Sequence, residues 1–237
     1  MKTNFTRTFF PHDHKEDHFK ALDVLRGIAV LLVLLSHSSN SNWMFHEFLN
    51  FQRTGKIGVY LFFVLSAYLL DRQIAIMLIS KKSNRRYWKN YILRRFLRIY
   101  PLFIVALLLH GLLSFFEYPT VIHSINIHSP KLYFPYAIAW GGVLIAAKYG
   151  QFGIKKILEW KAFRLLGTIS YSAYLFHMIV LVLLSNATNI PENYKIYIFF
   201  LATILVAILS YVLIEKPLSK IRLYNREVKN ESLKNKS

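Results

Sequence analysis

Long blocks of apolar residues constrain this 237-residue chain more than any other feature of its sequence. A soluble domain of this size places its apolar residues at helical or strand spacing, whereas here they continue in unbroken stretches. We count six blocks, at about residues 22–38, 57–79, 99–116, 133–147, 165–184 and 194–214. Most of them approach the ~20 residues that a helix needs to cross the hydrocarbon core of a bilayer. The sequence therefore predicts an all-α, polytopic membrane bundle of about six transmembrane helices.

The basic residues are distributed in a way that predicts how the bundle is oriented. Most of the 30 Lys and Arg lie in segments 1–20, 81–98, 148–164 and 216–237. The other connections hold only Arg53, Lys56, Lys131 and Lys195. With six spans the basic segments share one side of the membrane, which the positive-inside rule assigns to the cytoplasm. Both termini are therefore predicted to be cytoplasmic. The net charge of +18 then reports topology, and no nucleic-acid partner is expected.

The chain divides into a polar cytoplasmic head (1–20), a membrane domain (21–217) and a polar cytoplasmic tail (218–237). The head contains the run HDHKEDH, which is a pattern able to chelate metal but is more often simply solvated. We predict no metal site. The absence of cysteine excludes disulfides, thiolate metal sites and cysteine nucleophiles.

The first apolar block, LDVLRGIAVLLVLLSHS, carries an arginine near one end and a histidine near the other. Arg26 and His37 are eleven residues apart, which is about 20° past three full helical turns and roughly 16 Å of rise. Both side chains are therefore expected on one face of the first helix, with Asp23 placed to pair with Arg26.

Two interpretations of this pair remain open on position alone. Arg26 is either a snorkelling anchor at the inner boundary or a functional group. His37 is either an interfacial residue beside Ser36 and Ser38, or a buried ionisable group that faces a polar cavity. In the second case an imidazole is the usual general base for a hydroxyl group.

Five motifs in order along the chain resemble those of the acyltransferase-3 family, the membrane O-acyltransferases that modify bacterial polysaccharides. They are LDVLRGIAVLLVLLSH at the first block, GKIGVYLFFVLSAYLL (55–70), RRFLRIYP (94–101), GTISYSAYLFH (167–177) and IEKP (214–217). The resemblance implies a bacterial cytoplasmic (inner) membrane protein with His37 and Arg26 in the catalytic site.

The motif RRFLRIYP places Arg94, Arg95 and Arg98 within one helical turn of each other at the entrance to the third block. Guanidinium groups bind phosphate oxygens in a bidentate manner, but arginines at this boundary are also ordinary topological anchors. The resemblance implies that these three residues bind the phosphates of an acyl-coenzyme A, which is expected as the donor substrate, with no bound cofactor.

Several other residues are expected to support the site. Gly55 and Gly58 favour close helix packing, and Ser66 is a possible polar contact where the family's glycine is replaced by Ala67. On the fifth block, Tyr171, Tyr174 and His177 are predicted to form one polar stripe, with interhelical hydrogen bonding as the plainer interpretation. Glu215 either pairs with a donor-site arginine or, with Pro217, simply ends the last helix.

The predicted function is transfer of an acyl group, most plausibly acetyl, from acyl-coenzyme A to a hydroxyl of a cell-envelope saccharide. The family resemblance implies about ten spans, and the family's WSLxxE-type motif is absent from this sequence, so roughly four central spans are expected to be missing. This keeps two alternatives open: an inactive family remnant that acts as a membrane interaction protein, and a small transporter or channel. Polar faces without neighbours also favour self-association.

Overall fold

The computed structural model describes Phe9, Phe96 and residues 20–46, 48–79, 100–113, 138–145 and 160–218. All regular structure within these residues is helical, which confirms the all-α prediction for this part of the chain. The labelled helices are α2 (Lys20–Asn40), α3 (Gly55–Ile79), α7 (Lys161–Thr168), α8 (Ser170–Ser185), α9 (Glu192–Ser210) and the π-helix η3 (Tyr211–Glu215). Two further helices cover Tyr100–Leu113 and residues 138–145.

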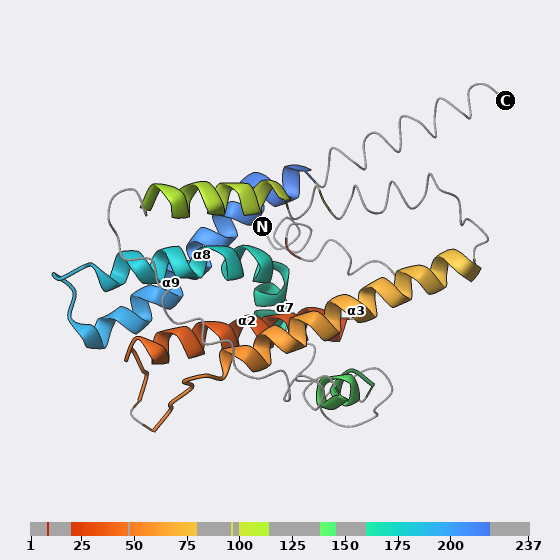
Figure 1. The fold of residues 1–237 in the computed structure, drawn as a ribbon, viewed down its shortest axis with the longest axis horizontal. Coiled ribbons are helices and arrows are strands. Elements are labelled where there is room, and N and C mark those ends of the chain that lie inside the picture. Colours follow the sequence, from red (N-terminus) through yellow and green to blue (C-terminus); the bar gives the residue numbers. More distant parts are fainter. Residues whose placement is uncertain are drawn as a thin grey trace.

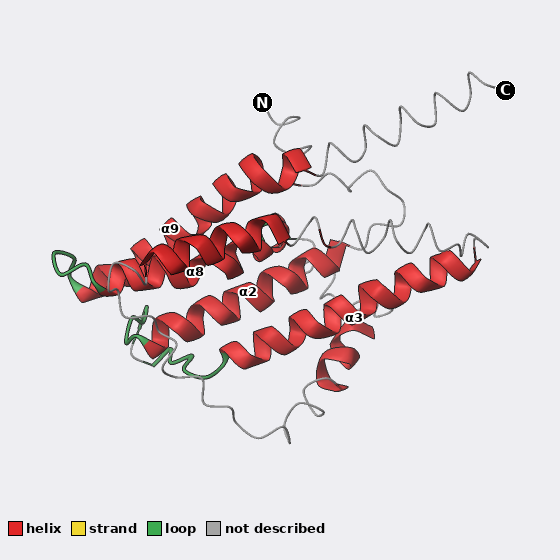
Figure 2. Cartoon of the chain, turned by 45° about the horizontal axis from the view of Figure 1, so that its top comes forward, coloured by secondary structure: helices red, strands yellow, loops and turns green. Residues whose placement is uncertain are grey.

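Helix α2 is at the centre of the bundle and packs against α3, α7, α8 and α9. The long helices lie roughly side by side (Figures 1 and 2), with α3 and α9 running opposite to α2 and α8. The loop after α2 meets the start of α9, where Trp43 Nε1 donates a hydrogen bond of 2.7 Å to Glu192. We call this end of the bundle the His37 end, and the opposite end, where α2 begins and α9 finishes, the Arg26 end.

Fewer described helices are both long enough and apolar enough to cross a membrane than the sequence predicts. Two described helices, Lys20–Asn40 and Glu192–Leu218, are long and apolar enough to cross a bilayer. A third crossing exists if α7 and α8 are taken as one broken span, and Tyr100–Leu113 is a shorter apolar helix. Each of the six predicted blocks contains a helix, but the number of crossings among the described residues is two or three.

The fifth block was predicted as one transmembrane helix, and the structure breaks it into two helices. The chain bends by 74° between α7 and α8, at Ile169. Ser170 Oγ donates a hydrogen bond of 2.8 Å to the carbonyl of Gly167 across the bend, a local bond of the kind that competes with helix continuation. The bend turns α7 against the start of α2, so that it packs there instead of extending the span.

Glycines bring the backbones of α2 and its neighbours into direct contact. A Cβ at Gly27 of α2 would meet the carbonyl of Phe163 in α7, and a Cβ at Gly58 of α3 would meet the carbonyl of Ala29 in α2. A Cβ at Gly55 would lie 3.1 Å from the side chain of Ser36, which is a close but looser approach. Small residues permit such close approach between membrane helices. The packing interpretation of Gly55 and Gly58 is therefore confirmed.

The outward face of α9 is apolar along its whole length. Its exposed large side chains recur every three or four residues: Tyr194, Tyr197, Leu201, Leu205, Leu209 and Leu213. A continuous apolar stripe of this size on the outside of a bundle is typical of a surface that faces lipid. The opposite face of the same helix, with Phe199, Thr203 and Ala207, is fully buried.

An ion pair between a buried lysine and an exposed glutamate closes the His37 end. Lys195 is only 5% exposed, its ammonium lies 2.7 Å from the carboxylate of Glu192, and it sits 5.6 Å from the centre of the buried Trp43 ring. The same carboxylate accepts the Trp43 hydrogen bond, so one side chain ties α9 to the loop after α2. Lys195, which the sequence placed among the few outer cations, is thus an internal group.

We expect Glu192→Ala to lower the melting temperature of the purified protein, because it leaves the buried Lys195 ammonium without its carboxylate. Glu192→Gln keeps an acceptor for Trp43 and should melt between wild type and the alanine variant. Thermal unfolding in detergent measures both. Equal melting of all three proteins would contradict a stabilising role for this tie.

Candidate functional site

The two conspicuous histidines of the sequence meet inside the bundle. The rings of His37 on α2 and His177 on α8 lie with centroids 5.1 Å apart and planes tilted by 51°. His37 is partly buried and His177 is 2% exposed. Tyr174, one turn before His177, contacts both the His177 ring (5.7 Å) and Phe62 of α3 (6.1 Å). Three helices therefore contribute rings to one cluster.

The backbone of α8 fixes the orientation of His177. Its Nδ1 lies 2.6 Å from the carbonyl oxygen of Tyr174. Because a carbonyl only accepts, Nδ1 is the donor, and the neutral ring then carries a lone pair on Nε2. Among the described residues Nε2 has no hydrogen-bond partner although it is buried.

The predicted polar stripe on the fifth block is not one uniform face. His177 is buried, Tyr171 is partly buried, and Tyr174 is 41% exposed. Successive three-residue steps turn by about 300° each, so these side chains wind around the helix. The side chains of Ser170 and His177 bond to backbone carbonyls three residues earlier in the chain.

At the Arg26 end, charged groups gather where α7 crosses α2. Asp23 and Arg26 are partly buried on α2, and the backbone of Gly167 on α7 lies directly against the Asp23 carbonyl. Arg164, on the same buried side of α7 as Gly167, is 4% exposed. The sequence analysis counted Arg164 among the basic residues of a cytoplasmic connection, and the structure instead buries it. Pairing of Asp23 with Arg26 stays a prediction.

Glu215 does not mark the end of the last helix. It is 8% exposed and accepts a hydrogen bond of 3.5 Å from Ser172 Oγ of α8. It closes the π-helix, and the helix then continues through Pro217 to Leu218, so the interpretation as a helix stop is wrong. Pro217 has no N–H to donate, and the wider π-turn stands just before it. Pairing of Glu215 with a donor-site arginine stays a prediction.

Phe9 lies at the same end and was not anticipated as a packed residue of the polar head. It is 7% exposed, stacks on Tyr211 at 5.6 Å, and its carbonyl accepts a hydrogen bond of 3.0 Å from Thr168 Oγ1. One residue of the head is therefore part of the bundle core.

The remaining predicted residues are not part of either cluster. Arg94, Arg95 and Arg98 lie outside the described residues, as does the HDHKEDH run. Ser66 is exposed on α3. The described residues contain no group of three or more His, Cys, Asp or Glu able to hold a metal ion.

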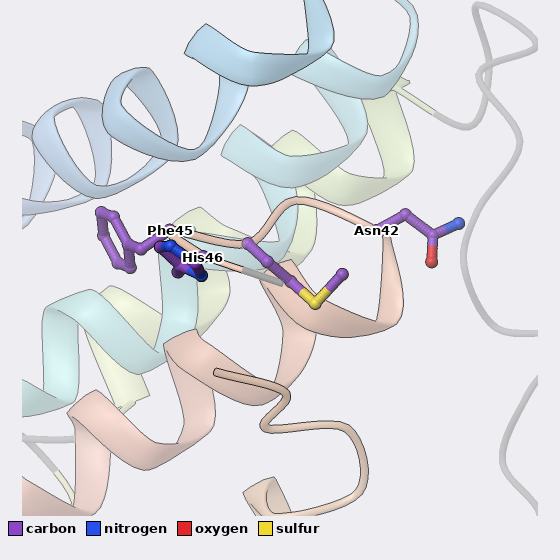
Figure 3. Close-up of a pocket in the computed structure, with 4 residues that line it drawn as sticks. Asn42, Phe45 and His46 are labelled. Carbon is purple, nitrogen blue, oxygen red and sulfur yellow. The ribbon is translucent and has the colours of Figure 1, made fainter. Parts of the chain in front are cut away.

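An open hollow of about 450 Å³ in the loop after α2 is lined by Asn42, Met44, Phe45 and His46. Figure 3 shows Asn42 pointing away from the Phe45 and His46 rings, and neither His37 nor His177 lines this hollow.

An apolar helical bundle with Arg26 and His37 on its first membrane helix is what the sequence motifs implied, and a comparison of protein families agrees. The family described as "Acyltransferase domain" matches residues 19–140, just over half of the chain. The chain belongs to this family, the acyltransferase-3 family, and is a membrane protein.

A curated relative is similar to a part of the chain. The peptidoglycan O-acetyltransferase OatA of Listeria monocytogenes serovar 1/2a is 27% identical over 159 residues, which are 66% of this chain. The chain spans only 22% of that relative's length. No solved structure matches.

Proposed function

We propose that this protein is a membrane O-acyltransferase that moves an acyl group, acetyl in the simplest case, from acyl-coenzyme A to a saccharide hydroxyl of the cell envelope. The observation that carries the proposal is the imidazole of His37, packed inside the bundle against His177 and eleven residues along α2 from Arg26. The name of the Listeria relative supports a cell-wall polymer as the acceptor.

The roles follow the two ends of the bundle. The Arg26 end faces the cytoplasm in a six-span arrangement with both termini inside, and acyl-coenzyme A binds there through Arg94, Arg95 and Arg98, with Arg26 holding the donor. His37 takes the proton of the acceptor hydroxyl while the hydroxyl oxygen attacks the thioester carbonyl. The carbon–sulfur bond breaks, and the thiolate leaves with the proton as the free thiol of coenzyme A. Asp23, Tyr171, Tyr174 and Glu215 support this arrangement.

The experiment is transfer of labelled acetyl from acetyl-coenzyme A by purified protein in liposomes, with a peptidoglycan fragment as the acceptor. Labelled product is expected for wild type, and about 10-fold less or lower for Arg98→Ala, because each lost charge-assisted phosphate contact weakens donor binding by ~1.5–3 kcal/mol. Lys56→Ala, which removes a cation at the His37 end, is the matched control and should keep full activity.

Two other functions give distinct outcomes in the same liposomes. A remnant that acts only as an interaction protein transfers no label until central spans from a complete relative are restored. A transporter moves substrate across the bilayer without forming an acylated product. Either outcome would overturn the proposed function.

A further inference from the structure

We infer that His177 is a positioning residue for His37, with its Nε2 lone pair accepting a hydrogen bond from the His37 imidazole. This inference rests on the proposed function for its catalytic consequence. The pairing itself stands on the geometry of two described helices, α2 and α8.

The first support is that His177 is built to be an acceptor. Its ring is held by the 2.6 Å bond from Nδ1 to the Tyr174 carbonyl, within its own helix, so the orientation is set before any substrate binds. That bond leaves Nε2 as the acceptor atom. His177 is 2% exposed, and its Nε2 has no hydrogen-bond partner among the described residues. Buried polar atoms are nearly always hydrogen-bonded, so such an atom calls for an explanation.

The second support is the position of His37. Its ring is the imidazole in contact with His177, at 5.1 Å between centroids and tilted by 51°. The two rings are in contact but are not hydrogen-bonded as they stand, so the inferred bond requires a His37 ring nitrogen to turn toward Nε2. Catalytic hydrogen bonds are commonly loose before substrate binds. His110, on the Tyr100–Leu113 helix, is close enough to His177 for an electrostatic interaction and is the third titratable group at this place.

The pairing gives His177 a defined part in the reaction. When His37 takes the hydroxyl proton it carries two N–H groups and a positive charge. One N–H faces the reacting oxygen, and the other donates to Nε2 of His177, which stays neutral because a second cation beside His37 and His110 is unfavourable. The proton then passes from His37 to the leaving thiolate, and His37 returns to its neutral form. His177 thus orients His37 and stabilises its cation without touching the substrate.

Two substitutions separate this role from packing. In His177→Asn the amide nitrogen can still donate to the Tyr174 carbonyl, but the Nε2 acceptor is lost. In His177→Gln an amide oxygen reaches the Nε2 position. We expect kcat to fall about 10- to 100-fold in the asparagine variant, the range seen when partners that orient metal-binding histidines are removed, and to recover largely in the glutamine variant. The KM for acyl-coenzyme A and the melting temperature should be the same in both. Full activity of His177→Asn, or equal losses in both variants, would overturn the inference.

A second measurement does not depend on turnover. In protein labelled with 15N-histidine, the Nε2 resonance of His177 should shift when His37 is replaced by alanine, and should not shift in His46→Ala. If wild type transfers no acyl group but this shift is seen, the proposed function fails and the pairing stands. If the Nε2 resonance is unchanged in His37→Ala, the pairing is refuted, whatever the protein's activity.

Discussion

His37→Ala is expected to reduce acyl transfer by about 10²- to 10⁴-fold, the range that a positioned general base contributes to catalysis. Other described carboxylates are not expected to take over: Asp23 and Glu215 lie at the other end of the bundle, and Glu192, at the His37 end, is held by Lys195 and Trp43. His177 is not expected to substitute either, because the α8 backbone fixes its ring and the side chain is only 2% exposed, which keeps Nε2 away from an acceptor hydroxyl. The measurement is the initial rate of acetyl transfer in liposomes at saturating acetyl-coenzyme A.

The matched control for this loss is His46→Ala. His46 lies in the exposed loop after α2 and lines the hollow of Figure 3, away from the His37–His177 pair. The His46→Ala substitution removes one imidazole near the same end of α2 and should leave the initial rate of acetyl transfer unchanged. Binding of coenzyme A should also survive in His37→Ala, because the donor arginines are predicted at the opposite end. A His37→Ala protein as active as wild type would remove His37 from the mechanism.

Helix positions were predictable from the sequence because the length of an apolar block sets the length of a membrane helix. The block at 22–38 became α2 (Lys20–Asn40), and the block at 194–214 became the helix Glu192–Leu218. The 74° bend was not predictable in the same way. The run GTISYS (167–172) interrupts the apolar residues at this place, but the size and direction of the bend depend on what α7 packs against.

At the candidate site, too, the sequence predicted what depends on one helix and not what depends on the packing of two. The eleven-residue spacing singled out Arg26 and His37, since that calculation needs only helical geometry. It could not show that His37 meets His177, because their contact depends on how α2 and α8 pack. Arg164 was misjudged for a related reason: a basic residue just before an apolar block is usually a boundary charge. Only the bend, which lays α7 on α2, buries it.

Gly167→Ala is expected to destabilise the protein strongly, because the contact it serves is between two backbones. A Cβ at Gly167 would overlap the carbonyl of Asp23, and neither partner has a flexible end that can move aside. Overpacking of this kind costs about 1–3 kcal/mol, here near the upper end, and the higher helix propensity of alanine returns about 1 kcal/mol. A net loss of about 2 kcal/mol corresponds to a Tm lower by roughly 4–8 °C for a chain of this size.

The control for helix propensity is Gly111→Ala. A Cβ at Gly111 would meet nothing within 4 Å among the described residues, so the same chemical change should leave Tm unchanged or raise it. The difference between the two variants isolates the backbone contact between α7 and α2. Because that contact places Arg164 beside the Asp23–Arg26 segment, Gly167→Ala should also impair acyl transfer at temperatures well below its Tm. Equal melting of both variants would mean that α7 does not pack on α2 through Gly167, and the buried position of Arg164 would then lose its physical basis.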